Sequence, residues 1–232
     1  MLSERQALIL EAAVREFIET GEPVSSGLLF EHHRFGIRPA MIRLELNDLA
    51  DAGYLEQPHH SAGRVPTDRG FEFFANRAVS RDAAVAGEPH LTELFEEGDW
   101  AGLTETLAER LGMLGVTSDI GHDAVYKGGL EHLIEHIEWQ SRDMLTSVIR
   151  DFEGLDRRLG CIENLFDDDE LKVFIGKKSP VTRCPELAVV AAQYDTDGQH
   201  VTVFAIGPKR MDYRKAARVL KGLKKQKIEN GK

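Results

Sequence analysis

The feature that most constrains the fold is a change in the spacing of apolar residues along the chain. In the first third they recur every three to four residues, as at Leu10, Val14, Phe17 and Ile18, which indicates amphipathic helices. In the last third they form the runs LKVFIG, LAVVAAQY and HVTVFAIG, which are typical of buried strands. The turn sequence DTDGQ separates the last two runs, so these strands are expected to pair antiparallel. The chain is therefore predicted to be an α+β protein whose N-terminal part is helical.

The N-terminal part is predicted to form a helix-turn-helix. A capping-box pattern opens a helix at Ser3, Ser25 and Ser26 can cap a short second helix, and Pro39 opens a third. Two short helices joined by a tight glycine turn are typical of this motif, whose recognition helix enters the major groove of DNA. Here that helix is the one with the sequence PAMIRLELNDLADAG.

The stretch HHSAGRVPTDRG, residues 59–70, follows a short extended segment and contains glycines and arginines. Gly63 permits a hairpin tip, and Arg64 can reach a phosphate or a groove from that position. The stretch is therefore predicted to be the wing of a winged helix.

Three parts of the chain follow from these patterns. Residues 1–80 are the predicted winged-helix DNA-binding domain. Residues 81–128 are expected to be an acidic helical linker that can also serve for dimerisation. Residues 129–232 are the predicted α+β domain, which ends in a basic helix.

Charge and composition exclude several classes of function. The net charge of −10 argues against a general polyanion binder, although residues 207–232 carry +8. No apolar run is long enough to span a membrane, and no signal peptide is evident. Cys161 and Cys184 are isolated, which fits reduced thiols and a cytoplasmic location. No catalytic or nucleotide-binding motif is present. HLIEH, residues 132–136, has the H-x-x-E-H spacing of a zinc site but no evident third ligand, so we expect neither an enzyme nor a metal or cofactor.

Several long motifs resemble one family. Near the N-terminus, the first motif is LSERQALILEAAVREFIETGEPVSS. It is followed by a predicted helix of the form P-A-x-I-R and then by the stretch GYLEQPHHSAGRVPTDRG. VFIGKKSP and AIGPKRMDYRKAARVL complete the resemblance near the C-terminus. Over about residues 1–80 and 129–222, the sequence resembles the heat-inducible transcription repressors of the HrcA family.

This resemblance implies a winged-helix DNA-binding domain followed by a GAF-like domain. It also implies a dimer that binds an inverted-repeat operator upstream of chaperone genes, with the chaperonin as a partner that supports repression. Family members usually carry an inserted dimerisation segment, for which residues 80–129 are too few. Dimerisation is therefore expected through the strand HVTVFAIG, if it lies at a sheet edge, or through one helical face that carries Leu103, Leu107, Leu111 and Leu114.

The predicted recognition helix departs from the family pattern. A small polar cap, a threonine and an asparagine are usual near its start, and Arg38, Met41 and Leu44 stand there instead. Arg43 and Asn47 can still read guanine and adenine edges. The residues predicted to contact DNA are Ser25, Ser26, Arg38, Met41, Arg43, Asn47, His60, Ser61 and Arg64.

Two other functions stay open at this point. The net charge of −4 over residues 1–80 and the altered helix also suit a winged-helix adaptor that binds protein. The GAF-like domain also suits a small-molecule sensor, and such a role can coexist with repression.

Overall fold

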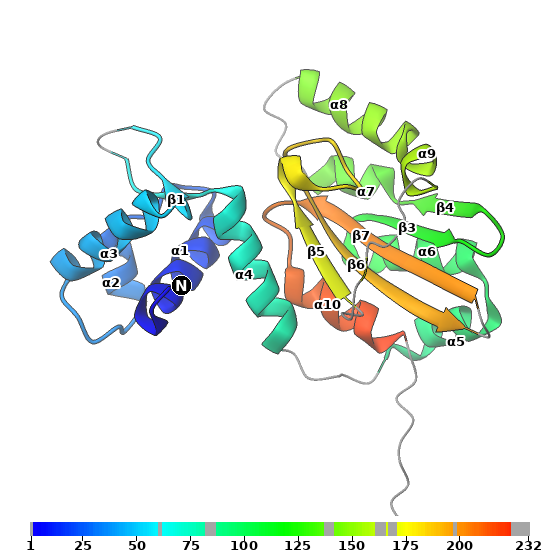
Figure 1. The fold of residues 1–232 in the computed structure, drawn as a ribbon, viewed down its shortest axis with the longest axis horizontal. Coiled ribbons are helices and arrows are strands. Elements are labelled where there is room, and N and C mark those ends of the chain that lie inside the picture. Colours follow the sequence, from blue (N-terminus) through cyan, green and yellow to red (C-terminus); the bar gives the residue numbers. More distant parts are fainter. Residues whose placement is uncertain are drawn as a thin grey trace, which may run out of the picture. The chain divides into compact units, whose positions relative to one another are not determined.

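The computed structural model describes residues 2–59, 62–81, 87–136, 142–160, 166, 171–196 and 199–223 (Figure 1). The chain divides into two compact units, Met1–Arg77 and Ala78–Lys232. Across the described ranges, none of the helices is both long enough and apolar enough to cross a membrane.

Among its described residues, the first unit contains three helices, a small hairpin and most of a fourth helix. The helices are α1 (Glu4–Thr20), α2 (Ser26–His32) and α3 (Pro39–Asp51), and the hairpin pairs β1 (Leu55–Glu56) with β2 (Val65–Pro66) antiparallel. α1 begins with the predicted capping box between Ser3 and Gln6 and ends at Gly21, whose backbone is left-handed. The inward faces of α1 and α3 meet in a core of Ile9, Leu10, Val14, Ile42, Leu46 and Leu49. α4 (Asp68–Arg81) follows the hairpin.

The second unit is built on a five-stranded antiparallel sheet with the strand order β4-β3-β7-β6-β5. Its strands are β3 (Leu114–Asp119), β4 (Ala124–Gly128), β5 (Leu171–Ile175), β6 (Leu187–Thr196) and β7 (Gln199–Pro208). Its helices are α5 (Pro89–Glu97), α6 (Trp100–Leu111), α7 (Leu130–His136), α8 (Arg142–Glu153), α9 (Leu155–Leu159) and α10 (Tyr213–Gly222), and a 3-10 turn spans Gly176–Lys178. The predicted α+β class and antiparallel pairing are confirmed.

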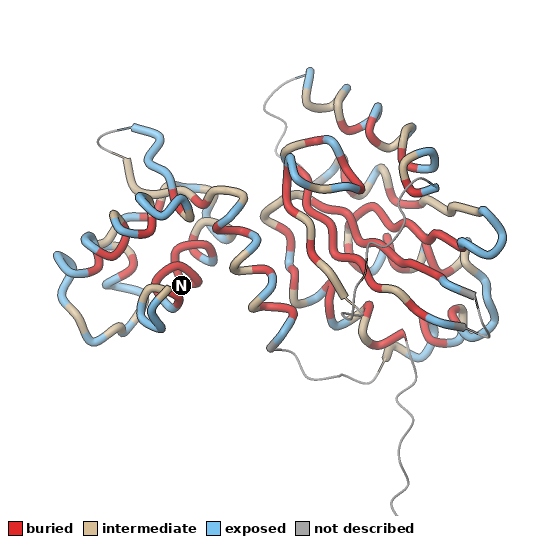
Figure 2. Tube along the Cα trace, in the orientation of Figure 1, coloured by how far each residue is buried: buried red, intermediate tan, exposed pale blue. Residues whose placement is uncertain are grey.

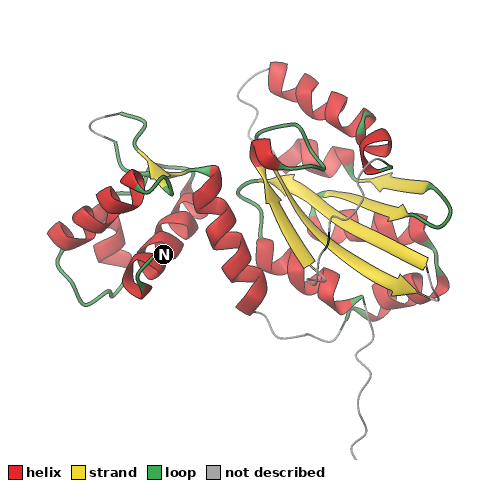
Figure 3. Cartoon of the chain, viewed as in Figure 1, coloured by secondary structure: helices red, strands yellow, loops and turns green. Residues whose placement is uncertain are grey.

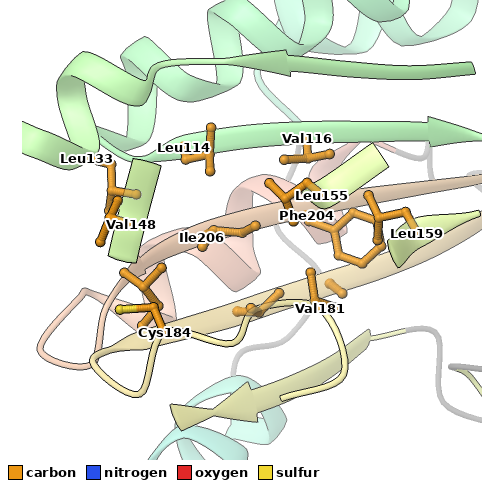
Figure 4. Close-up of a cluster of buried hydrophobic side chains, with 13 residues drawn as sticks. Leu114, Val116, Leu133, Val148, Leu155, Leu159, Val181, Cys184, Phe204 and Ile206 are labelled. Carbon is orange, nitrogen blue, oxygen red and sulfur yellow. The ribbon is translucent and has the colours of Figure 1, made fainter. Parts of the chain in front are cut away.

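Helices cover both faces of this sheet (Figure 3). On one face α6 and α10 are tied to strands: the Thr104 hydroxyl donates to the Thr117 hydroxyl at 2.7 Å, and the Tyr194 hydroxyl donates to the Leu220 carbonyl. On the other face, β3, β6 and β7 pack under α7, α8 and α9 (Figure 4). The central strands are buried on both sides, which explains their continuous apolar sequence (Figure 2).

The segment 81–128 differs from the expected acidic linker. Beyond Arg81, the last residue of α4, its described residues form α5, α6, β3, β4 and the connections between them, and these elements belong to the second unit. The sequence does not predict β3, because LGVTSD contains glycine, serine and aspartate, which are not typical of a strand. Its pairing with β7 on one side and β4 on the other supplies the order that local propensity lacks.

The structure also contradicts the expected dimerisation residues. Leu103, Leu107 and Leu111 of α6 and Leu114 of β3 are at most 6% exposed within a single chain. The strand HVTVFAIG is β7, which lies between β3 and β6 rather than at an edge. Both candidate surfaces are therefore core, since a face buried inside one chain is not available to a second.

Candidate nucleic-acid interface

The α2–α3 pair is positioned by local capping and by a glycine turn. The Ser25 hydroxyl accepts a hydrogen bond from the Leu28 amide at 3.1 Å, which caps α2. Gly36 adopts a positive φ of 71° in the connection, a conformation that favours glycine. Pro39 occupies the first turn of α3, where its missing N–H costs nothing. Ser25 thus acts as a cap, and Ser26 lies half-buried at the first position of α2.

α3 presents one apolar face to the core and a mixed face to solvent. Ile42, Leu46 and Leu49 are buried, whereas Met41 is 42% exposed and Leu44 is 55% exposed. Arg43 is also exposed. At 3.6 residues per turn, Leu44 lies near the centre of the outward face, with Met41 and Arg43 on its two sides.

Three arginines surround the start of α3. Arg34, Arg38 and Arg43 are exposed, and none of them makes an ion pair or hydrogen bond to a residue that the structure describes. No acidic residue lies in the first turn of α3, and Arg38 is the N-cap without making a side-chain capping bond. These guanidinium groups are therefore available for an anionic partner.

Two other arginines of this unit are engaged internally. Arg5 donates to Glu45 at 2.7 Å, and Arg77 forms an ion pair with Glu11. Both carboxylates are buried, so each ion pair offsets the cost of placing a charge in the core.

Glu16 of α1 is a third buried carboxylate, and its partners are two histidines. His32 Nδ1 lies 3.1 Å from its oxygens, and His33 Nε2 lies 2.9 Å away. Burial alone raises the pKa of Glu16, but the hydrogen bonds and charges of both histidines outweigh it, so the pKa falls below its ordinary value of 4.5. This cluster fixes the end of α2 against α1. No sequence motif indicated it, because its members lie 16 and 17 residues apart.

The stretch predicted to be a wing, residues 59–70, is attached to the helices through Arg64. Val24 and Arg64 exchange two backbone hydrogen bonds of 2.9 and 2.8 Å, which adds a short bridge beside the β1–β2 hairpin. The Arg64 side chain then turns to α3, where its Nη2 donates to Asn47 Oδ1 at 2.7 Å. Two predicted DNA contacts are thus bonded to each other.

The position of Gly63 differs from the expected hairpin tip. It lies beside the Val24–Arg64 bridge, where a Cβ atom would come within 2.5 Å of the Val24 carbonyl oxygen. Glycine is required there for the close approach of two backbone segments rather than for a turn. His60 and Ser61, also predicted to contact DNA, lie outside the described residues.

The fold and this surface define an α+β protein with a separate helical unit that presents cationic side chains around one helix. The family model described as the HrcA protein C-terminal domain matches residues 73–217, which is more than half of the chain. The chain belongs to the HrcA family, as its motifs predicted.

Curated relatives carry the name heat-inducible transcription repressor HrcA. The one from Streptomyces avermitilis is 41% identical over 98 residues, which cover 42% of this chain and 29% of the relative. The one from a Parafrankia species is 40% identical over 172 residues, which cover 72% of this chain and 50% of the relative. The chain thus spans half or less of the length of these relatives.

A solved structure shares the fold. The crystal structure of a hypothetical protein superposes with a TM-score of 0.77 at 17% sequence identity, and the match covers 96% of both chains.

Proposed function

We propose that this chain is a sequence-specific DNA-binding repressor of heat-shock genes and that its first unit is a winged helix-turn-helix. The observation that carries the proposal is the start of α3, where three exposed guanidinium groups have no partner among the described residues while the opposite face of the helix is buried. The curated relatives, which are named transcription repressors, support the same function.

The residues divide into three roles under this proposal. Arg43, at the start of the second turn of α3, reads a guanine edge, because a guanidinium can donate two hydrogen bonds to O6 and N7. Arg34 and Arg38 neutralise phosphates on either side of the groove. Arg64 and Asn47 hold the wing against α3, so that both elements meet the duplex in one fixed arrangement.

The second unit would serve assembly and regulation. An inverted-repeat operator requires two recognition helices related by two-fold symmetry, so we propose that two protomers bind one operator. The chaperonin partnership and the GAF-like character that the resemblance implies stay predictions for this chain. The dimer surface must be one that is exposed in the single chain, which excludes the buried leucines of α6.

The test is enrichment of duplexes from a random-sequence library by the full chain, followed by affinity measurements at several KCl concentrations. A repressor enriches a related set of sequences, and the logarithm of its affinity falls with the logarithm of salt by about 0.9 for each phosphate neutralised. No enrichment, or binding without salt dependence, would refute the proposal and favour a protein-binding adaptor. Sedimentation at saturating protein then counts the protomers on each duplex.

A further inference from the structure

Met41 and Leu44 form an apolar pair on the exposed face of α3. They are 42% and 55% exposed, and a spacing of three residues makes their side chains neighbours on the helix surface. Single exposed apolar residues are common on proteins and need no explanation. This pair differs in its position, because it occupies the centre and one side of the α3 face that contacts DNA in the proposed function.

The surroundings of the pair are cationic. Arg43 lies on the other side of Leu44, Arg38 is the N-cap, and Arg34 precedes it in the connection. The first carboxylate on the exposed face is that of Asp48, one turn beyond Leu44. A surface of this kind fits a partner that combines dense negative charge with small apolar groups at its centre.

The polar side chain next along this face is already engaged. Asn47 accepts the hydrogen bond of Arg64 on Oδ1, the atom that would otherwise accept from the N6 amino group of adenine. The exposed side chains in the first two turns of α3 are therefore the guanidinium of Arg43 and apolar groups, of which Met41 and Leu44 are the largest.

Resting on the proposed function, we infer that Met41 and Leu44 read thymine by contact with its C5 methyl group in the major groove. The thymine methyl is the apolar group that the major groove displays, and it distinguishes thymine from every other unmodified base. Together with Arg43, this chemistry specifies a half-site in which a guanine lies next to thymines. The specificity is that of this chain, since it depends on Met41 and Leu44, two of the three positions at which the sequence departs from the family pattern.

Replacement of thymine by deoxyuridine tests the inference, because it removes the methyl group and leaves base pairing unchanged. Duplexes enriched from the random library are remade with deoxyuridine at one thymine at a time, and the affinity of the full chain is measured by fluorescence anisotropy. At the contacted positions we expect about a fourfold loss for each methyl group, the value for burial of one such group. Leu44→Ala and Met41→Ala should each abolish, at one position, the difference in affinity between the thymine and the deoxyuridine duplex. Leu8→Ala, which removes a leucine that is 46% exposed on α1, should preserve it.

The outcomes separate the inference from the proposed function. Enriched duplexes that bind equally with thymine or deoxyuridine overturn thymine readout and leave the repressor intact, as do enriched duplexes that lack thymines. A chain that enriches no sequence overturns both. The affinities of the wild-type chain for the thymine and deoxyuridine duplexes test thymine readout even if a variant fails to fold. If Leu44→Ala loses the same affinity on the thymine duplex as on the deoxyuridine duplex, Leu44 does not contact a thymine methyl group.

Discussion

Arg64, at the base of the proposed wing, donates a hydrogen bond from Nη2 to Oδ1 of Asn47 on α3 at 2.7 Å. The same arginine is bonded through its backbone to Val24, between α1 and α2. One residue therefore joins the wing, the connection before α2 and the outward-facing helix. The side chain predicted to reach a phosphate therefore makes this hydrogen bond to α3 within the single chain.

Arg64→Ala and Asn47→Ala are each expected to weaken DNA binding on every sequence tested. The double variant should lose less than the sum of the two, with a coupling energy of about 0.5–3 kcal/mol, because both changes remove the same hydrogen bond. The dependence of affinity on salt should be unchanged for Arg64→Ala. Fluorescence anisotropy over a range of KCl concentrations measures the affinity and its dependence on salt. If Arg64→Ala lowers the slope of log affinity against log salt by about one, Arg64 contacts a phosphate.

Gly63→Ala is expected to destabilise the first unit by about 1–3 kcal/mol, the usual cost of an overpacked site. Its new Cβ atom would lie 2.5 Å from the Val24 carbonyl oxygen and would separate the Val24–Arg64 bridge. Gly27→Ala is the matched control, because its Cβ atom would lie 3.7 Å from the nearest atom and alanine favours the helix. Thermal unfolding followed by circular dichroism compares the two, and equal melting temperatures would show that the bridge is dispensable.

Leu107→Asp is expected to unfold the second unit rather than to separate protomers. The variant loses a fully buried leucine and places a carboxyl group in the core, at a cost of at least about 3 kcal/mol. Ala101→Asp puts the same group on the exposed side of α6 and should change stability by less than about 0.5 kcal/mol. Thermal unfolding together with sedimentation distinguishes the outcomes. A folded Leu107→Asp monomer would restore α6 as an interface.

Glu16→Gln tests the histidine-bound carboxylate through pH. Since the pKa of Glu16 is lowered on folding, ionised Glu16 stabilises the first unit above its ordinary value of 4.5, and this contribution is lost as pH falls through the folded pKa. Above pH 4.5, the amides of α2 should therefore be better protected from hydrogen exchange in wild type than in Glu16→Gln. Below pH 4.5, this difference in protection should become smaller. Exposed Glu19→Gln is the control. A gap that widens on acidification would contradict the assignment.

The parts of this fold that local sequence determines were predictable, and those that depend on distant partners were not. The cap of α1 at Ser3 and the apolar runs of β6 and β7 are local signals, and the structure has these elements. β3 lacks such a signal because its order comes from β7, which lies more than 80 residues further along the chain. The bond between Arg64 and Asn47 likewise joins residues 17 apart, so the sequence could suggest two separate DNA contacts but not their contact with each other.

The central claim is that α3 reads base sequence, and Arg43 tests it most directly. Arg43→Ala and the control Arg15→Ala, which removes an exposed arginine of α1, are compared on an enriched duplex and on all its single-base variants. We expect that Arg43→Ala loses about 1–3 kcal/mol of binding energy and that its preference disappears at one guanine–cytosine pair, while Arg15→Ala keeps the full preference. An equal loss on every sequence, or no loss at all, would contradict readout by α3.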